Sequence, residues 1–171
     1  MSVFAELFSI RFLFSCIMCF GVLMITPAFV SFWIGKKYVM DSLSLLLMTA
    51  ILFVNLSRTT VDAYINAYGL FGDIWAPIVE ASLNVGLSII LGYYFGLHGV
   101  LSGVLISLLL VVFCWKPYYL FRKGLDERLS IYIFMYARHL MAALLCGVIV
   151  CLGMRYSMVQ GCLLYTSDAA D

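Results

Sequence analysis

Three ionisable residues, Arg58, Asp62 and Glu80, lie inside long apolar stretches of this sequence. A charged side chain in a membrane-spanning segment is energetically expensive, so each one is by default a candidate for function. Arg58 and Asp62 are spaced so that one helix face carries both. Charges placed in this way can form an ion pair, relay a proton or line the path of a polar substrate. A proton relay is an open interpretation for Asp62 and Glu80.

Polar side chains extend from these charges at helical spacing. Asn55, Thr59, Asp62 and Asn66 recur every three or four positions, and Glu80 is followed by Asn84 and Ser88 at every fourth position. Two polar stripes on adjacent helices predict a wet cavity. The predicted substrate-path residues are Arg58, Asp62, Asn66, Glu80, Asn84 and Ser88.

A structural interpretation of the same residues stays open. Arg58 and Asp62 can pair with each other, while Glu80 and Asn84 hydrogen-bond a neighbouring helix and hold the bundle together. The length of the polar stretch after Val54 favours a cavity, because helix packing alone rarely needs so many polar side chains together.

The composition indicates what kind of elements position these residues. Of the 171 residues, 65% are hydrophobic and 11% are charged, and the mean hydropathy is +1.09. An ordinary soluble domain is about half apolar and about a quarter charged. So much apolar surface cannot be buried in a soluble fold of this size. The sequence therefore predicts an all-α fold, a polytopic membrane helix bundle.

About five transmembrane helices are predicted from the apolar runs, because a bilayer core needs about 20 apolar residues per helix. The second run becomes too polar after Val54 to face lipid along its whole length. Pro27 predicts a kink in the first run. The predicted spans cover residues 12–34, 41–68, 75–95, 100–115 and 130–154.

The distribution of basic residues predicts how the bundle is oriented. An excess of Lys and Arg marks cytoplasmic loops. The stretch after the fourth predicted span is basic, which places it inside, together with the start of the chain. Lys36, Lys37 and Arg155 then lie outside, against six residues inside: Arg11, Lys116, Arg122, Lys123, Arg128 and Arg138.

Other classes of function find little support in the sequence. The near-neutral net charge of +1 argues against nucleic acid as a partner, because phosphate binding needs clustered basic residues on a solvated face. Cys16 and Cys19 form a C-x-x-C inside an apolar run with no second pair, so no metal site is predicted. No catalytic residues and no cofactor are predicted. Gly99 and Gly103 form a G-x-x-x-G that predicts close helix packing.

Several passages resemble bacterial polysaccharide flippases of the multidrug, oligosaccharidyl-lipid and polysaccharide exporter superfamily, in the C-terminal half of those proteins. The likeness covers a little over half of the chain, between residues 32 and 125. It lies in residues 32–38 (FWIGKKY), 64–71 (YINAYGLF), 76–84 (APIVEASLN), 96–103 (GLHGVLSG) and 115–123 (WKPYYLFRK).

The resemblance implies two helix bundles of similar fold, of which this chain contains one or most of one. It implies a multi-pass protein of the bacterial inner membrane that moves undecaprenyl-diphosphate-linked oligosaccharide outward for polysaccharide biosynthesis. The implied partners are membrane lipid, the lipid-linked oligosaccharide and a missing N-terminal bundle. Arg58 is the intramembrane cation that could attract the diphosphate, although Asp62 would partly neutralise it.

Two other functions stay open. One is a cation-coupled multidrug exporter of the same superfamily, which would use Asp62 or Glu80. The other is a non-transporting membrane subunit whose polar stripes bind partner helices. Residues 162–171 (CLLYTSDAAD) resemble the translation of a sequencing adapter, so the native part is expected to be residues 1–161.

Overall fold

The computed structural model describes residues 2–69, 72, 75–125 and 130–148. The described residues are helical apart from short connections, and no strand occurs among them. The chain is an all-α bundle, as the composition predicted. Within these described ranges, four helices are long and apolar enough to cross a membrane: Val3–Trp33, Ser42–Ala67, Trp75–Lys123 and Ser130–Val148. The protein is therefore a multi-pass membrane protein.

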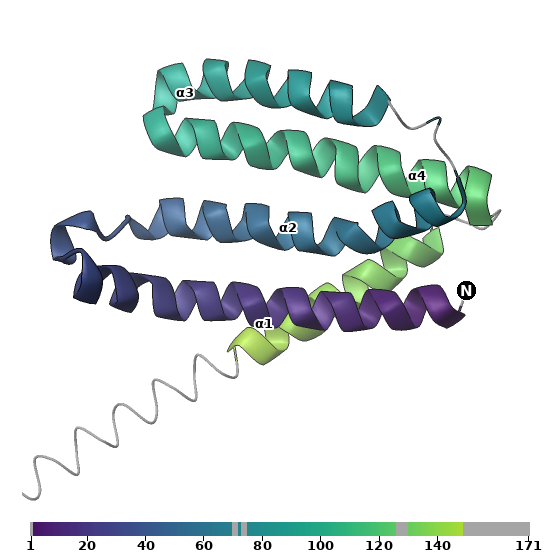
Figure 1. Cartoon of the computed structure of the whole chain (residues 1–171), viewed down its shortest axis with the longest axis horizontal. Coiled ribbons are helices and arrows are strands. Elements are labelled where there is room, and N and C mark those ends of the chain that lie inside the picture. Colours follow the sequence, from purple (N-terminus) through teal and green to yellow (C-terminus); the bar gives the residue numbers. More distant parts are fainter. Residues whose placement is uncertain (1, 70–71, 73–74, 126–129, 149–171) are drawn as a thin grey trace, which may run out of the picture. The chain divides into compact units, whose positions relative to one another are not determined.

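The long third segment consists of several consecutive helices. α3 covers Trp75–Leu109, a π-helix covers Leu110–Trp115, α4 covers Lys116–Leu120, and a second π-helix covers Phe121–Leu125. α3 itself turns back at Gly96, where φ is 59° and ψ is −136°. Its two halves lie side by side in Figure 1, where α3 is drawn in teal and green. The predicted spans 75–95 and 100–115 correspond to these two halves and the π-helix that follows.

Close backbone contact holds the two halves of α3 together. A Cβ atom built on Gly99 would lie 1.9 Å from the backbone oxygen of Leu91, and one on Gly103 would lie 2.7 Å from the backbone nitrogen of Ser88. Both distances are far below van der Waals contact, so only glycine fits at either position. The G-x-x-x-G therefore packs within the chain.

The first helix begins well before the first predicted span. α1 covers Ser2–Trp33, so it begins about three turns before residue 12 and continues through Pro27. Phe4, Phe8 and Phe12 are all buried, and their spacing puts them on one face. The Phe4 ring lies 4.9 Å from that of Tyr64 and 5.7 Å from that of Phe121, centroid to centroid. These contacts stabilise the part of α1 that precedes residue 12.

α2, Ser42–Ala67, lies beside α1 on one side and the second half of α3 on the other (Figure 1). Phe12 of α1 meets Phe53 of α2 at 5.3 Å between ring centroids. A small core joins Val54 of α2 to Leu108 and Val112. α2 is thus the central helix of this part of the bundle, and it carries Arg58 and Asp62.

Two connections meet at the end of the bundle where α2 begins. The 3-10 helix Lys36–Tyr38 precedes α2, and Asp41 caps α2 by accepting a hydrogen bond from the backbone N–H of Ser44. Asp41 Oδ2 also lies 2.8 Å from His98 Nε2, beside the turn of α3. The predicted loops 35–38 and 96–99 therefore share one end. Which side of the membrane this end faces remains a prediction.

The Asp41 cap predicts a pH dependence of stability. The hydrogen bond with His98, followed by that from Ser44, lowers the pKa of Asp41 below its ordinary value. A carboxyl group whose pKa is lowered in the folded state stabilises that state above its unfolded pKa of about 4, and this contribution is lost as the pH falls through the lowered value. We expect Asp41→Asn to lower the melting temperature at neutral pH. The difference from the parent should shrink steadily below pH ~4, and a difference that grows in acid would contradict this.

Residues 133–148 belong to a separate compact unit of the chain, and they continue the helix that begins at Ser130. Most of their apolar side chains are exposed. His139 Nδ1 hydrogen-bonds the backbone oxygen of Met135 one turn earlier. The rest of the predicted span 130–154 and the tail 162–171 lie outside the described residues.

Candidate functional site

Four charged side chains from three helices form one continuous network. Arg58 Nη1 donates to Glu80 Oε1 at 2.7 Å, and Arg58 Nε lies 3.7 Å from Asp62 Oδ2. The other oxygen of Asp62 accepts a hydrogen bond of 2.5 Å from Lys116 Nζ. Glu80, Arg58, Asp62 and Lys116 therefore alternate in sign. We call this set the charge network.

The charge network is only partly shielded from its surroundings. The side chain of Lys116 is 9% exposed and that of Glu80 is 16% exposed, whereas Arg58 and Asp62 reach 27% and 30%. Charged groups this exposed cannot face hydrocarbon without a large cost, because lipid offers no hydrogen bonds. Their open side therefore requires water or another polar surface.

The charge network lies well within the length of the bundle. At about 1.5 Å per residue, Arg58 is about 24 Å from the first residue of α2 and about 14 Å from its last residue. Glu80 is a little over one turn into α3, and Lys116 begins α4. The network is therefore nearer the end of the bundle at which α2 finishes and α3 begins.

The prediction for Lys116 was wrong. The sequence placed it in a basic boundary after the fourth span, but it is buried and paired with Asp62. The helical backbone continues without a break through the π-helix Leu110–Trp115 into α4, which directs Lys116 toward α2. Charge balance was the available signal, because Asp62 and Glu80 together need two cations while Arg58 supplies one. Without Lys116, the count of basic residues that predicts the orientation is five inside against three outside.

Only some residues of the predicted polar stripe on α2 join the charge network. Arg58 and Asp62 join the charge network, whereas Asn66 is exposed and takes no part in the ion pairs of the described residues. Asn55 Nδ2 and Thr59 Oγ1 donate to backbone oxygens of their own helix. Thr59 also accepts from Arg11 Nη1 at 3.4 Å, which links α1 to the site.

The predicted stripe on α3 divides into two parts. Glu80 pairs with Arg58 across the helices, while Asn84 and Ser88 interact within α3. Ser88 Oγ donates to Asn84 Oδ1 at 3.1 Å and lies 3.4 Å from the backbone oxygen of Val100. Asn84 and Ser88 line an open groove between the two halves of α3, together with Gly92 and neighbouring valine and isoleucine side chains. They are therefore a second polar site.

Two further hydroxyl groups next to Arg58 were not predicted as functional. Ser57 and Thr60 are 5% and 4% exposed, and their side-chain oxygens have no hydrogen-bond partner among the described residues. A buried hydroxyl group without a partner carries a cost of about 1–3 kcal/mol.

The charge network is suited to exchange of ionic partners. It has two carboxylates and two cations, so its formal charge is zero. Within the described part of the chain, no group of His, Cys, Asp and Glu residues could hold a metal ion. Cys19 of the C-x-x-C contacts the backbone oxygen of Thr49 at 3.7 Å. An anion that approaches Arg58 or Lys116 must compete with a carboxylate already bound there.

Comparison with known proteins assigns no family to the chain: no family model matches it, and no curated protein or solved structure matches it.

Replacement of Lys116 tests whether the charge network stabilises the bundle. Lys116→Met keeps the length of the side chain but leaves Asp62 with only Arg58, so we expect a loss of about 1–2 kcal/mol in the free energy of unfolding. Thermal unfolding of the detergent-solubilised chain measures this. Lys37→Met, at an exposed site in the 3-10 helix, should leave the melting temperature unchanged. Equal stability of both variants would show that the pair with Asp62 contributes nothing.

Proposed function

We propose that this chain is part of a membrane transporter and that the charge network lines an aqueous translocation path. The observation that carries the proposal is the partial exposure of paired charges inside membrane-spanning helices. A charge that faces lipid costs about 2.5–3.5 kcal/mol at the bilayer centre and less toward the interface. The partial exposure of Arg58, Asp62 and Glu80 within these helices therefore favours a water-filled space beside them.

We further propose that the transported substrate is a lipid-linked oligosaccharide carried on undecaprenyl diphosphate, in the bacterial inner membrane. The support is the resemblance of residues 32–125 to polysaccharide flippases, and an N-terminal bundle would complete the path. In this proposal Arg58 and Lys116 are the groups that attract the diphosphate. The Asn84 and Ser88 groove offers neutral hydrogen-bonding groups to sugars.

The pairing within the charge network suggests how substrate binding and conformational change are coupled. In this structure, Glu80 is paired with Arg58, and Asp62 is paired with Lys116. A diphosphate that takes these cations releases the carboxylates, which then lose their interhelical partners. Because Arg58 joins α2 to α3 and Lys116 joins α4 to α2, this release weakens both helix contacts. Alternating access requires such a switch.

Export of surface polysaccharide tests the proposal in cells that carry the full-length protein. We expect Arg58→Gln to reduce export by about tenfold at normal protein level, since it removes a charge-assisted contact to phosphate. Lys37→Gln, a charge loss at an exposed position, is the matched control and should export normally. Unchanged export by the Arg58 variant, at normal protein level, would remove Arg58 from the mechanism.

A cation-coupled exporter of the same superfamily is a second candidate, favoured by the two carboxylates in the charge network. Glu80 pairs with one cation among the described residues and Asp62 with two, so Glu80 is the carboxylate more readily released to bind a proton or sodium ion. Ion-dependent dye efflux that is lost in Glu80→Gln, with normal polysaccharide, would favour this function. A non-transporting subunit remains the third candidate, and it predicts that a partner helix covers the charge network.

A further inference from the structure

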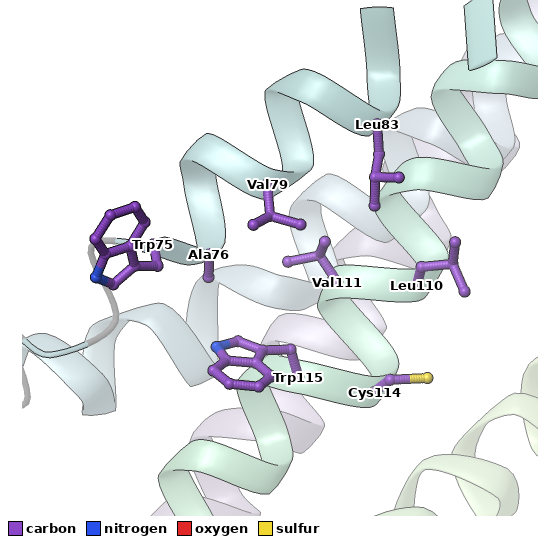
Figure 2. A pocket seen from close by; sticks show the side chains of 8 residues that line it. All are labelled: Trp75, Ala76, Val79, Leu83, Leu110, Val111, Cys114 and Trp115. Carbon is purple, nitrogen blue, oxygen red and sulfur yellow. The ribbon is translucent and has the colours of Figure 1, made fainter. Parts of the chain in front are cut away.

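A separate apolar pocket lies on another face of the first turns of α3, at the same end of the bundle. Its volume is about 380 Å³, within the usual range for small-molecule sites. It is formed between the first turns of α3 and the π-helix Leu110–Trp115, by side chains that include Val79, Leu83, Leu110 and Cys114. Figure 2 shows Trp75 and Trp115 together at one end of the pocket and Leu83 and Leu110 toward the other.

The two tryptophans place the mouth of the pocket near a membrane interface, at the end of the bundle toward which the charge network also lies. Trp75 is 71% exposed and Trp115 is 49% exposed. Tryptophan side chains concentrate where hydrocarbon meets headgroups, because the ring is apolar while its N–H needs a polar partner. A pocket that opens at this level and is lined by apolar side chains suits a hydrocarbon chain.

Basic side chains continue from the pocket in the direction of the headgroups. Arg122 is about 10 Å beyond Trp115 along the helix. Trp115, Tyr118 and Arg122 are exposed, whereas Lys116 and the residues at positions 120 and 121 are buried, so the exposed residues share the outer side. The Arg122 guanidinium carbon lies 5.5 Å from the centre of the Tyr118 ring, and Lys123 Nζ lies 5.2 Å from that of Tyr119.

Neither basic group is neutralised by a carboxylate in the part of the chain that the structure describes. Among the described residues, Arg122 and Lys123 thus add two unpaired positive charges beyond an apolar pocket with a tryptophan mouth. This order of apolar, aromatic and cationic groups matches the order of chain, interface and phosphate in an anionic phospholipid.

We propose that this pocket binds one acyl chain of an anionic membrane phospholipid, whose phosphate is held by Arg122 and Lys123. The site is distinct from the charge network, since it uses other faces of α3 and other cations. It does not rest on the proposed transport function, so either can fail without the other. The bound lipid would fix the contact between the first turns of α3 and the π-helix.

Brominated lipids test the proposal, because bromine on an acyl chain quenches a tryptophan that it touches. The full chain carrying Trp33→Phe, in which Trp75 and Trp115 remain as reporters, is placed in vesicles with brominated phosphatidylglycerol or brominated phosphatidylcholine at equal mole fraction. We expect brominated phosphatidylglycerol to produce the same degree of quenching as brominated phosphatidylcholine at about fivefold lower mole fraction. The double substitution Arg122→Gln and Lys123→Gln should abolish that preference while quenching persists.

Two single substitutions by phenylalanine distinguish binding in the pocket from contact with the surrounding lipid. Val79→Phe fills the pocket and should remove the excess quenching by the anionic lipid. Ile90→Phe changes an exposed apolar position on α3 outside the pocket and should retain it. The proposal would be overturned if these two variants behaved alike or if the preference for the anionic lipid survived the loss of both cations. It would also be overturned if no quenching occurred in the parent. The last result would mean that protein covers the pocket.

Discussion

Replacing Gly99 with alanine is expected to destabilise the protein by about 3 kcal/mol, because overpacking a close helix contact costs at least 1–3 kcal/mol. The new methyl group would lie 1.9 Å from the backbone oxygen of Leu91, and a backbone atom cannot rotate away as a side chain can. The two halves of α3 must then separate. The melting temperature of the detergent-solubilised chain measures the effect.

Gly86→Ala is the matched control for this substitution. Gly86 lies on the same helix, but nothing lies within 4 Å of an added Cβ atom. Alanine favours a helix over glycine by about 0.5–1 kcal/mol, so this variant should unfold at the same or a higher temperature. Equal melting temperatures of the Gly99 and Gly86 variants would contradict the close contact between the halves of α3.

Arg58→Gln is expected to have the second-largest effect, since it breaks two of the three ion pairs of the charge network. Glu80 loses its only cation, and Asp62 keeps Lys116. Loss of one partner leaves an uncompensated charge, which costs 3–5 kcal/mol when fully buried. Because these side chains are partly exposed, we expect a loss of about 1–3 kcal/mol.

A double-mutant cycle with Glu80→Gln shows whether this loss belongs to the pair. The variant with both substitutions has no unpaired charge at this contact, so it should be more stable than the sum of the single effects predicts. We expect a coupling energy of about 1 kcal/mol or more. Additive effects would mean that Arg58 and Glu80 do not stabilise each other. Chemical unfolding of the same four proteins supplies the data.

The sequence predicted the parts of the fold that depend on local hydropathy and backbone constraints. The all-α membrane bundle follows from long apolar runs, α2 begins where its span was predicted, and α3 turns at a glycine between the predicted spans 75–95 and 100–115. The start of α1 could not be predicted in this way. It depends on contacts of Phe4 with Tyr64 and Phe121, which are far away in the sequence.

The same distinction applies to the charge network. Helical spacing alone brought Arg58 and Asp62 together, because residues four apart share a face. The partners from other helices depend on how those helices rotate and slide against α2. The pairing of Glu80 with Arg58 and of Lys116 with Asp62 was therefore not predicted. Likewise, Asn66 shares the helical spacing but lies on an exposed part of α2, outside the network.

Access of water to the charge network is the claim on which the proposed function depends. The most direct test is reaction of single cysteines with a membrane-impermeant thiol reagent, in the full-length protein without its other cysteines. Asp62→Cys and Asn84→Cys should react, whereas Ile90→Cys, at an exposed apolar position on α3, should not. If positions 62 and 84 are as unreactive as position 90 in every state, no aqueous path reaches them and the transport proposal is wrong.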